Sequence, residues 1–153
     1  MVDAVEQTTS RSAAETEAFG EGLGRRLTGG DVVLLNGELA AGKTTMVRGL
    51  LRALGGSADE VSSPTFVLVQ SYPCAGGEVA VVHHVDLYRL RDDEGSLREI
   101  GLEEFLSETD AVVVVEWPRS ALERLLPAGC RWWRVTFTHA GGDSRTLRVT
   151  PSP

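Results

Sequence analysis

The chain has 153 residues, and its 22 acidic residues outnumber its 15 lysines and arginines, which gives a net charge of −7 at pH 7. This acidic balance disfavours autonomous binding to nucleic acid, because such binding depends on neutralising phosphates with basic side chains. The length predicts one domain over residues 1–153, and no apolar run is long enough to cross a bilayer, so we expect a soluble, cytoplasmic protein without membrane contact.

The N-terminal segment is polar, and we predict that residues 1–9 form a flexible arm. Ser12 and Glu15 then fit the capping-box pattern that begins a helix. Apolar residues recur on one face of this helix up to Leu27, although three glycines within it lower its helix propensity. We expect the helix to cover the sheet, and nothing in its sequence identifies a contact with a ligand.

The next segments form a nucleotide-binding pattern. An apolar run at residues 31–36, DVVLLN, is typical of a buried strand in a parallel sheet. Residues 37–44, GELAAGKT, then fit the phosphate-loop pattern GxxxxGK[ST] at every fixed position. Apolar residues follow at helical spacing until Gly55 and Gly56 end the helix. A strand, the full motif and a helix in this order predict a triphosphate-binding loop.

The residue types of this loop explain how it would hold a nucleotide. Small residues let successive backbone N–H groups turn toward phosphate oxygens, and the helix that follows directs its positive end at them. The Lys43 ammonium can reach the terminal phosphates, and the Thr44 hydroxyl is placed to ligate a magnesium ion. Ala40 is less suited to this loop than glycine, because glycine would adopt a positive φ there more easily.

A polar loop, residues 57–63, leads into an apolar run at residues 66–69 that we predict to be a strand. Thr65 lies between the polar loop and the strand, where many such proteins sense the γ-phosphate through magnesium, although a threonine taken alone is more often a turn residue. Residues 78–86 form a second strand, paired with the first as a hairpin. It ends at Asp86, which could reach magnesium or a water, or could cap a turn.

Within the second strand, His83 and His84 point to opposite faces, because side chains alternate along a strand. The two imidazoles cannot easily ligate one metal ion. We therefore expect each histidine to have a structural or hydrogen-bonded role.

Residues 92–106 predict one or two short amphipathic helices, interrupted by a glycine. Residues 111–116, AVVVVE, are typical of a buried parallel strand that carries an acid to the edge where the phosphate loop lies. Since an unpaired carboxylate after four buried valines would be costly, Glu116 is the best candidate to face magnesium opposite Thr44. Trp117 follows, and it could pack beside the nucleotide, gate water or fill space.

The C-terminal part predicts a short helix over residues 121–126 and a closing β-hairpin made by residues 131–139 and 144–150. The order of all these elements predicts an α/β fold: a three-layer P-loop NTPase-like domain with a mixed, mostly parallel central sheet. Cys74 and Cys130 lie far apart and form no CxxC motif, so we expect neither zinc nor a disulfide framework.

The chain contains, in order, the motifs LNGELAAGKTT, SSPTFVL, HHVDLYRL, IGLEEFL and VVVVEWP. Together they resemble the TsaE family, small bacterial ATPases required to make threonylcarbamoyladenosine in tRNA, and the resemblance covers most of the chain. It implies ATP and Mg2+ as ligands, with Thr44 and Glu116 on the metal side. Two departures are Glu38 and Ala40, where the family more commonly has Asp and Gly.

The resemblance also implies roles for individual residues. Lys43, Asp86 and Glu116 would be catalytic, while Thr65 and Trp117 would belong to a switch-like loop and to the catalytic neighbourhood. As a hypothesis, Asp86 or Glu116 orients the attacking water, and Lys43 stabilises charge on the β- and γ-phosphates. We expect the nucleotide to contact Leu39, Ala40, Ala41, Gly42, Lys43, Thr44 and Thr45.

The implied partners are the TsaD and TsaB proteins, and tRNA would be reached only through their complex. ATP binding and hydrolysis by the small subunit would then reset the complex between turnovers. We expect weak hydrolysis by the chain alone, because no arginine finger is evident; Arg89 is the nearest candidate. Two alternatives remain open. One is a small-molecule kinase, and the other is a non-catalytic assembly module in which ATP orders residues 62–66 for a partner.

Overall fold

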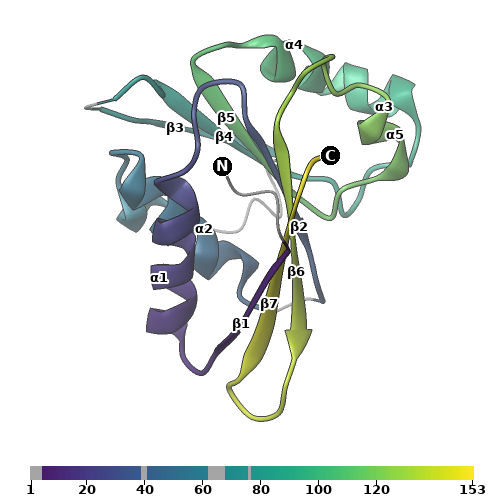
Figure 1. The fold of residues 1–153 in the computed structure, drawn as a ribbon. Coiled ribbons are helices and arrows are strands. Elements are labelled where there is room, and N and C mark those ends of the chain that lie inside the picture. Colours follow the sequence, from purple (N-terminus) through teal and green to yellow (C-terminus); the bar gives the residue numbers. More distant parts are fainter. Residues whose placement is uncertain (1–4, 39–40, 62–67, 76) are drawn as a thin grey trace.

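The computed structural model describes residues 5–38, 41–61, 68–75 and 77–153. These ranges contain a seven-stranded sheet with the strand order β1-β7-β6-β2-β5-β4-β3 (Figure 1). The strands are β1 (Glu6–Ser10), β2 (Val32–Asn36), β3 (Val69–Pro73), β4 (Val81–Asp86), β5 (Ala111–Glu116), β6 (Trp132–His139) and β7 (Arg145–Pro151).

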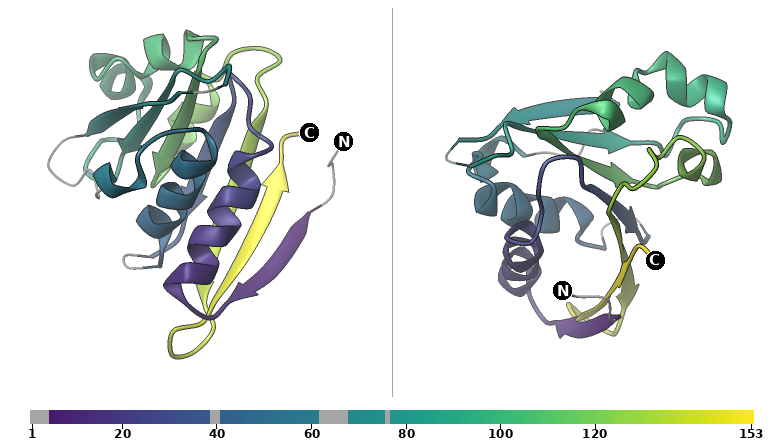
Figure 2. Two further views of the ribbon diagram at one scale, coloured as in Figure 1. Left: turned by 90° about the vertical axis from the view of Figure 1, so that its left-hand side faces the viewer. Right: turned by 45° about the horizontal axis from the view of Figure 1, so that its top comes forward.

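Helices cover both faces of this sheet (Figure 2). The helices are α1 (Ala13–Gly24), α2 (Lys43–Ala53), the short 3-10 turn η1 (Ala58–Glu60), α3 (Glu94–Glu99), α4 (Leu102–Ser107) and α5 (Ser120–Glu123). α1 and α2 lie on one face, and α3, α4 and α5 lie on the other. The predicted three-layer α/β fold is therefore confirmed.

The alternation of side chains along the central strands produces the two cores. In β2, Val33 and Leu35 pack with the helices α1 and α2, whereas Val32 and Leu34 pack with α3, α4 and α5. Successive residues of a strand point to opposite faces, so a strand in the middle layer must be apolar throughout. β5 is the clearest example, since all six of its residues are buried.

Strand directions place the carboxyl ends of β4, β5, β2 and β6 at one edge of the sheet. β2 is parallel to β5 and β6, and β5 is parallel to β4, while β3 and the pair β7 and β1 flank them in antiparallel contacts. The register pairs Glu116 with Leu35 on one side and with Asp86 on the other. The mixed sheet and the two hairpins are as predicted. The first strand of the β3–β4 hairpin is displaced from its predicted place at residues 66–69, because the pairing with β4 covers Val69–Pro73.

The flexible arm predicted for residues 1–9 is wrong for residues 6–9. Glu6–Ser10 forms β1, which pairs antiparallel with β7. The Glu6 carboxylate also accepts two hydrogen bonds from the Arg26 guanidinium, at 3.0 and 2.8 Å. The segment is polar, and it is held in place by pairing with β7 and by a bidentate ion pair. Residues 1–4 lie outside the described residues.

α1 begins at the predicted cap. The Ser12 hydroxyl accepts a hydrogen bond from the Glu15 N–H at 3.1 Å, and the Glu15 carboxylate accepts one from the Arg11 N–H at 3.0 Å. This reciprocal arrangement satisfies N–H groups that the first helical turn leaves unpaired. It also fixes the N-terminus of α1 close to the edge where the strands end.

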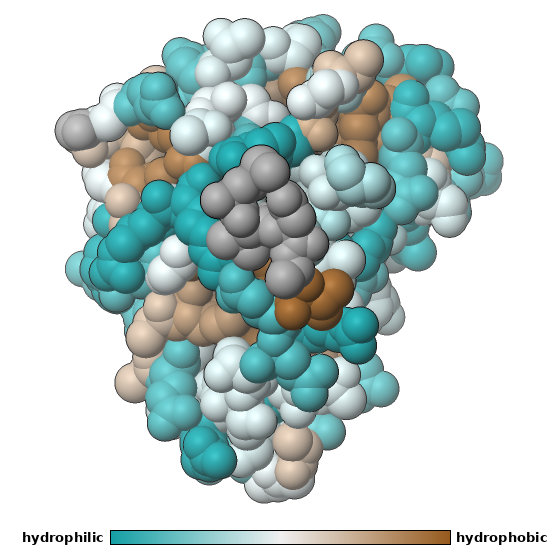
Figure 3. Space-filling model, viewed as in Figure 1, coloured by the Kyte–Doolittle hydropathy of each residue, from teal (hydrophilic) through white to brown (hydrophobic). Residues whose placement is uncertain are grey.

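The remaining helices lie where they were predicted, but α1 ends at Gly24, before Leu27, and α5 covers only Ser120–Glu123 of the helix predicted at residues 121–126. α3 and α4 are separated at Gly101, whose φ of 82° is the left-handed conformation that glycine tolerates. Within the described part of the chain, no helix combines the length and apolar character needed to cross a membrane. The face of the molecule in Figure 3 is mainly hydrophilic, with small separate hydrophobic areas.

Candidate functional site

The phosphate-loop motif lies where the sequence predicted it, between the end of β2 at Asn36 and the start of α2 at Lys43. Gly42 caps α2 with a φ of 100°, a conformation that a residue with a Cβ rarely adopts. Gly37 packs against β6, where an added Cβ would lie 2.8 Å from the Cβ of Phe137. Leu39 and Ala40 lie outside the described residues, so the effect of Ala40 on the loop is not described.

The Lys43 side chain is folded back onto its own loop. Its ammonium donates a hydrogen bond to the Gly37 carbonyl oxygen at 2.7 Å and lies 3.7 Å from the centroid of the Trp117 ring. Only 4% of Lys43 is exposed, and this burial lowers its pKa, while the charges of Glu116 and Asp86 act in the opposite direction. The ammonium is thus held in a water-poor position next to the loop.

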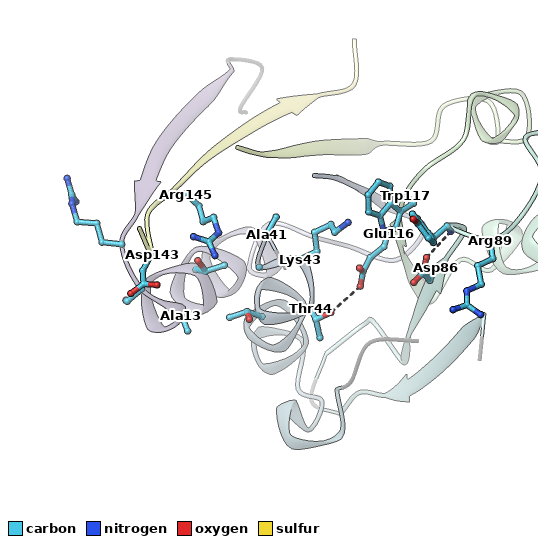
Figure 4. A pocket seen from close by; sticks show the side chains of 16 residues that line it. Ala13, Ala41, Lys43, Thr44, Asp86, Arg89, Glu116, Trp117, Asp143 and Arg145 are labelled. Carbon is cyan, nitrogen blue, oxygen red and sulfur yellow. Dashed lines mark hydrogen bonds between the residues drawn. The ribbon is translucent and has the colours of Figure 1, made fainter. Parts of the chain in front are cut away.

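Glu116 ends β5 beside the first turn of α2, and it is 3% exposed. Its Oε2 atom is 2.5 Å from His84 Nε2 and accepts a long hydrogen bond of 3.5 Å from the Thr44 hydroxyl (Figure 4). Thr44 and Glu116 therefore face each other across the site, as predicted for a magnesium-side pair. Both present oxygen atoms, the ligands that Mg2+ prefers.

Asp86 ends β4 directly beside Glu116 in the sheet and is 8% exposed. Its Oδ1 atom accepts a hydrogen bond from the Tyr88 N–H at 2.9 Å. Burial raises the pKa of Asp86 above its usual value, and the neighbouring Glu116 carboxylate raises it further, against the effects of Tyr88 N–H, Lys43 and His84. Two buried acids and one buried ammonium thus meet at the carboxyl ends of the strands.

The raised pKa of Asp86 predicts a pH-dependent stability. The folded chain holds the Asp86 proton more tightly than the unfolded chain, so ionisation at neutral pH lowers the free energy of unfolding, and this cost vanishes below the ordinary aspartate pKa of about 4. Asp86→Asn removes the charge and keeps an acceptor for the Tyr88 N–H. Without nucleotide, we expect this variant to melt at a higher temperature than the wild type near neutral pH and at the same temperature in acid, as measured by circular dichroism.

Asp59→Asn provides the control for this comparison, because it makes the same chemical change at an exposed position outside the cavity lining. A melting temperature of Asp86→Asn below that of the wild type near neutral pH would contradict the assignment.

Trp117 has a φ of 57°, which is unusual for a residue other than glycine. Its ring packs against Tyr88 with 4.8 Å between the ring centroids, as well as against the Lys43 ammonium. Tyr88 is 48% exposed, a large fraction for an aromatic side chain. The structure thus places an aromatic pair at the mouth of the site, held by a backbone conformation that costs free energy.

Hydrogen bonds in both directions connect the segment after β4 with the segment after β5. Arg119 donates hydrogen bonds to the carbonyl oxygens of Leu87 at 3.2 Å and Tyr88 at 2.6 Å. In return, the Asp92 carboxylate accepts a hydrogen bond from the Ala121 N–H at 2.8 Å, which lowers the pKa of Asp92. These ties fix the relative position of the two segments that carry the buried acids.

A cavity of about 770 Å3 opens over these groups. This volume lies in the range of small-molecule and cofactor sites. Figure 4 shows Lys43, Thr44, Glu116, Asp86 and Trp117 around one part of the cavity, and Ala13, Asp143 and Arg145 around the other. The predicted residues that line it are Ala41, Gly42, Lys43, Thr44, Thr45, Asp86, Arg89, Glu116 and Trp117. Thr65 lies outside the described residues.

The sequence reasoning missed one part of this cavity. Its lining there comes from the start of α1 and the two residues before it, from the β6–β7 turn and from the first residue of β7: Arg11, Ser12, Ala13, Thr16, Asp143 and Arg145. β1 and β6 both run parallel to β2, so the segments that follow them return to the edge where the phosphate loop lies. The Ser12 cap signal was visible in the sequence, but its position beside the loop depends on pairings that no local pattern indicates.

Comparison with known proteins identifies relatives of the whole chain. The model of the family described as "Threonylcarbamoyl adenosine biosynthesis protein TsaE" matches residues 10–147. A Streptomyces coelicolor protein named tRNA threonylcarbamoyladenosine biosynthesis protein TsaE is 43% identical over 107 residues, which cover 70% of each chain. A protein of the same name from Nostoc sp. is 34% identical over 153 residues, 96% of this chain and 88% of the relative.

A solved structure resembles the fold over almost its full length. The crystal structure of Bacillus subtilus YdiB matches with a TM-score of 0.68 and 26% sequence identity, covering 97% of this chain and 86% of that chain. The similarity therefore extends beyond the phosphate-loop motif to the sheet and its helices.

Proposed function

This chain belongs to the TsaE family, whose members serve the biosynthesis of threonylcarbamoyladenosine in tRNA, and from this premise we propose that it binds and hydrolyses ATP with Mg2+. Hydrolysis supports the formation of the modified nucleoside by a complex of the TsaD and TsaB proteins. The protein acts in the cytoplasm, and its acidic charge leaves contact with tRNA to that complex.

One observation carries this proposal: a buried ammonium, a hydroxyl and two buried carboxylates converge on a loop with the phosphate-binding pattern. Lys43 and Thr44 come from the start of α2, whereas Asp86 and Glu116 come from the ends of β4 and β5. Burying such charges is costly unless they serve a ligand or one another. A nucleotide triphosphate with its metal complements all four groups.

In this proposal, Lys43 exchanges its present contacts for phosphate oxygens. The Gly37 carbonyl and the Trp117 ring are neutral partners, whereas a phosphate oxygen carries charge, and charge-assisted hydrogen bonds are the stronger ones. Because Lys43 is largely buried, its charge acts on the phosphates through little screening water. Its position stabilises negative charge that moves onto the β- and γ-phosphates.

Thr44 and Glu116 are the residues that would hold Mg2+. Their oxygen atoms already lie 3.5 Å apart. Burial and then the adjacent Glu116 carboxylate raise the pKa of Asp86, and a cation held here would favour its ionised form. Within the described ranges, no group of three or more acidic, histidine or cysteine side chains could hold a metal unaided. Nucleotide phosphates and water would supply the remaining ligands, as is usual for Mg2+, which neutralises phosphate charge when bound.

Asp86 is then the residue that orients the attacking water. Glu116 is engaged with Thr44 and His84. Asp86 lines the cavity, and its Oδ1 atom accepts a hydrogen bond from the Tyr88 N–H. Its raised pKa gives it more basic character than an exposed aspartate has. The other part of the cavity, along the start of α1, has room for the nucleoside.

Phosphate release, measured with and without the TsaD and TsaB proteins, tests this function. We expect slow release from ATP by the chain alone and strong stimulation by the complex. Phosphoryl transfer to small alcohols or nucleotides would instead indicate the kinase. ATP-dependent complex formation without any phosphate release would indicate the assembly module.

Replacing Glu116 with glutamine is expected to reduce phosphate release about 100-fold, because it removes a charged metal ligand while keeping the shape of the side chain. Nucleotide binding without metal, measured with a fluorescent ATP analogue, should change little. Glu108→Gln is the matched control, since Glu108 also pairs with a histidine of β4, His83, but outside the cavity lining. If Glu116→Gln hydrolyses ATP at the wild-type rate, the proposed role of Glu116 is wrong.

A further inference from the structure

We propose that His84 is a positioning residue that holds the Glu116 carboxylate in place for Mg2+. This inference rests on the proposed function, because it concerns the orientation of a carboxylate assigned to the metal. The imidazole is not itself among the residues that line the cavity, and it acts through Glu116, which is one of them.

Strand pairing brings the two side chains together. His84 lies opposite Val114 of β5, and Glu116 is two residues further along the same face of that strand. Diagonal neighbours of this kind lie within reach of long side chains. His84 Nε2 is 2.5 Å from Glu116 Oε2, and His84 is fully buried, so the contact is shielded from water.

The surroundings of His84 determine which atom carries the proton. Among the described residues, its Nδ1 atom is buried and has no hydrogen-bond partner. A proton on Nδ1 would therefore leave a buried donor unsatisfied, which costs more than an unpartnered lone pair. A neutral imidazole with its proton on Nε2 fits this environment, and it donates that proton to Glu116 Oε2.

This bond constrains the carboxylate. With Oε2 held between the imidazole and the Thr44 hydroxyl, the plane of the carboxylate is fixed, and so is the direction of Oε1. Carboxylates that ligate metals depend on such outer hydrogen bonds for orientation, and losing one typically weakens metal binding 10- to 100-fold. A leucine would fill the same core position without burying a polar atom, so packing alone does not account for a histidine.

The neighbouring His83 provides an internal comparison. It lies on the other face of the sheet, where its ring packs on Phe105 with 4.4 Å between centroids. Its nitrogens contact the Ser71 hydroxyl at 2.7 Å and Glu108 at 3.2 Å. Glu108 is 39% exposed and is remote from the phosphate loop, so the same substitution at His83 should leave the metal site intact.

The test compares His84→Leu, His84→Gln and His83→Leu with Glu116→Gln and the wild type. Manganese affinity is measured by electron paramagnetic resonance in complexes with a non-hydrolysable ATP analogue. We expect His84→Leu to weaken manganese binding about tenfold. His84→Gln, whose amide nitrogen reaches the position of Nε2, should restore it to within about threefold, and His83→Leu should bind manganese as the wild type does. Analogue binding in the presence of EDTA should be equal in all variants.

Two outcomes separate the inference from the proposed function. If His84→Leu binds manganese as tightly as the wild type while Glu116→Gln does not, the positioning role is wrong and the metal role of Glu116 stands. If Glu116→Gln also binds manganese normally, the proposed metal site itself is wrong.

A measurement on the folded wild type does not depend on the stability of any His84 variant. Nitrogen-15 NMR of the imidazoles should show His84 with its proton on Nε2, and this signal should shift in Glu116→Gln but not in Glu108→Gln. A proton on Nδ1, or an unchanged signal in Glu116→Gln, would overturn the inference.

Discussion

Replacing Lys43 with methionine is expected to reduce ATP hydrolysis about 1,000-fold, because it removes the cation that faces the terminal phosphates. Methionine retains the length of the side chain and can still pack on the Trp117 ring. Burial lowers the pKa of the Lys43 ammonium, which means that the charged form of Lys43 is destabilised in the folded chain. Methionine removes this charge. The fold should therefore survive a substitution that abolishes activity.

Two measurements distinguish loss of function from loss of structure in this variant. The melting temperature without nucleotide should stay within a few degrees of the wild type, whereas the rise in melting temperature on adding ATP should disappear, because that rise reports binding to the folded state. Arg48→Met is the matched control, since it removes a cation from the same helix outside the cavity lining. An ATP-induced rise that persists in Lys43→Met would show that the loop does not bind the phosphates.

The parts of the site that the sequence predicted are those specified by local patterns. The phosphate loop is recognisable because residues 37–44 contain all of its chemistry within one segment. Glu116 was predictable because a run of valines requires a buried strand, and a buried strand in a parallel sheet carries its last residue to the binding edge. In both cases, a short segment contains the information that places the residue.

The parts that could not be predicted depend on contacts between distant segments. Glu6–Ser10 is polar and forms a strand only because β7 offers an edge to pair with. The contact between His84 and Glu116 requires the register of β4 against β5, and the turn that carries Asp143 reaches the cavity only because β6 lies parallel to β2. The partner of a strand and its register depend on tertiary contacts, so the composition of a single strand does not reveal them.

The glycines of α1 also show that a local sequence pattern does not reveal contacts between distant segments. Their low helix propensity argues against a stable helix, yet α1 packs closely on α2 at two reciprocal points. A methyl group on Gly20 would lie 2.1 Å from the Met46 carbonyl oxygen, and one on Gly49 would lie 1.8 Å from the Glu17 carbonyl oxygen. Both obstacles are backbone atoms, which cannot move aside as the end of a side chain can. The absence of a Cβ is therefore what allows the two helices to approach.

Gly20→Ala and Gly49→Ala are each expected to lower the free energy of unfolding by about 3 kcal/mol or more, because overpacking against backbone forces the helices apart. Gly22→Ala on the same helix is the matched control. A methyl group at Gly22 meets no atom within 4 Å, so the better helix propensity of alanine should raise stability by about 0.5–1 kcal/mol. Urea unfolding followed by circular dichroism measures all three values.

A separation of α1 from α2 in Gly20→Ala should also displace the phosphate loop, because α2 begins at the end of that loop. Met46 is in the first turn of α2, two residues after Thr44. Pushing this helix away from α1 therefore moves the Thr44 hydroxyl and the Lys43 ammonium relative to Glu116, which belongs to β5. We expect Gly20→Ala to weaken ATP binding even at a temperature where it remains folded, and Gly22→Ala to bind ATP as the wild type does. Wild-type ATP binding by folded Gly20→Ala would mean that close helix packing does not set the position of the loop, and equal stability of the Gly20 and Gly22 variants would mean that Gly20 is not overpacked by a methyl group.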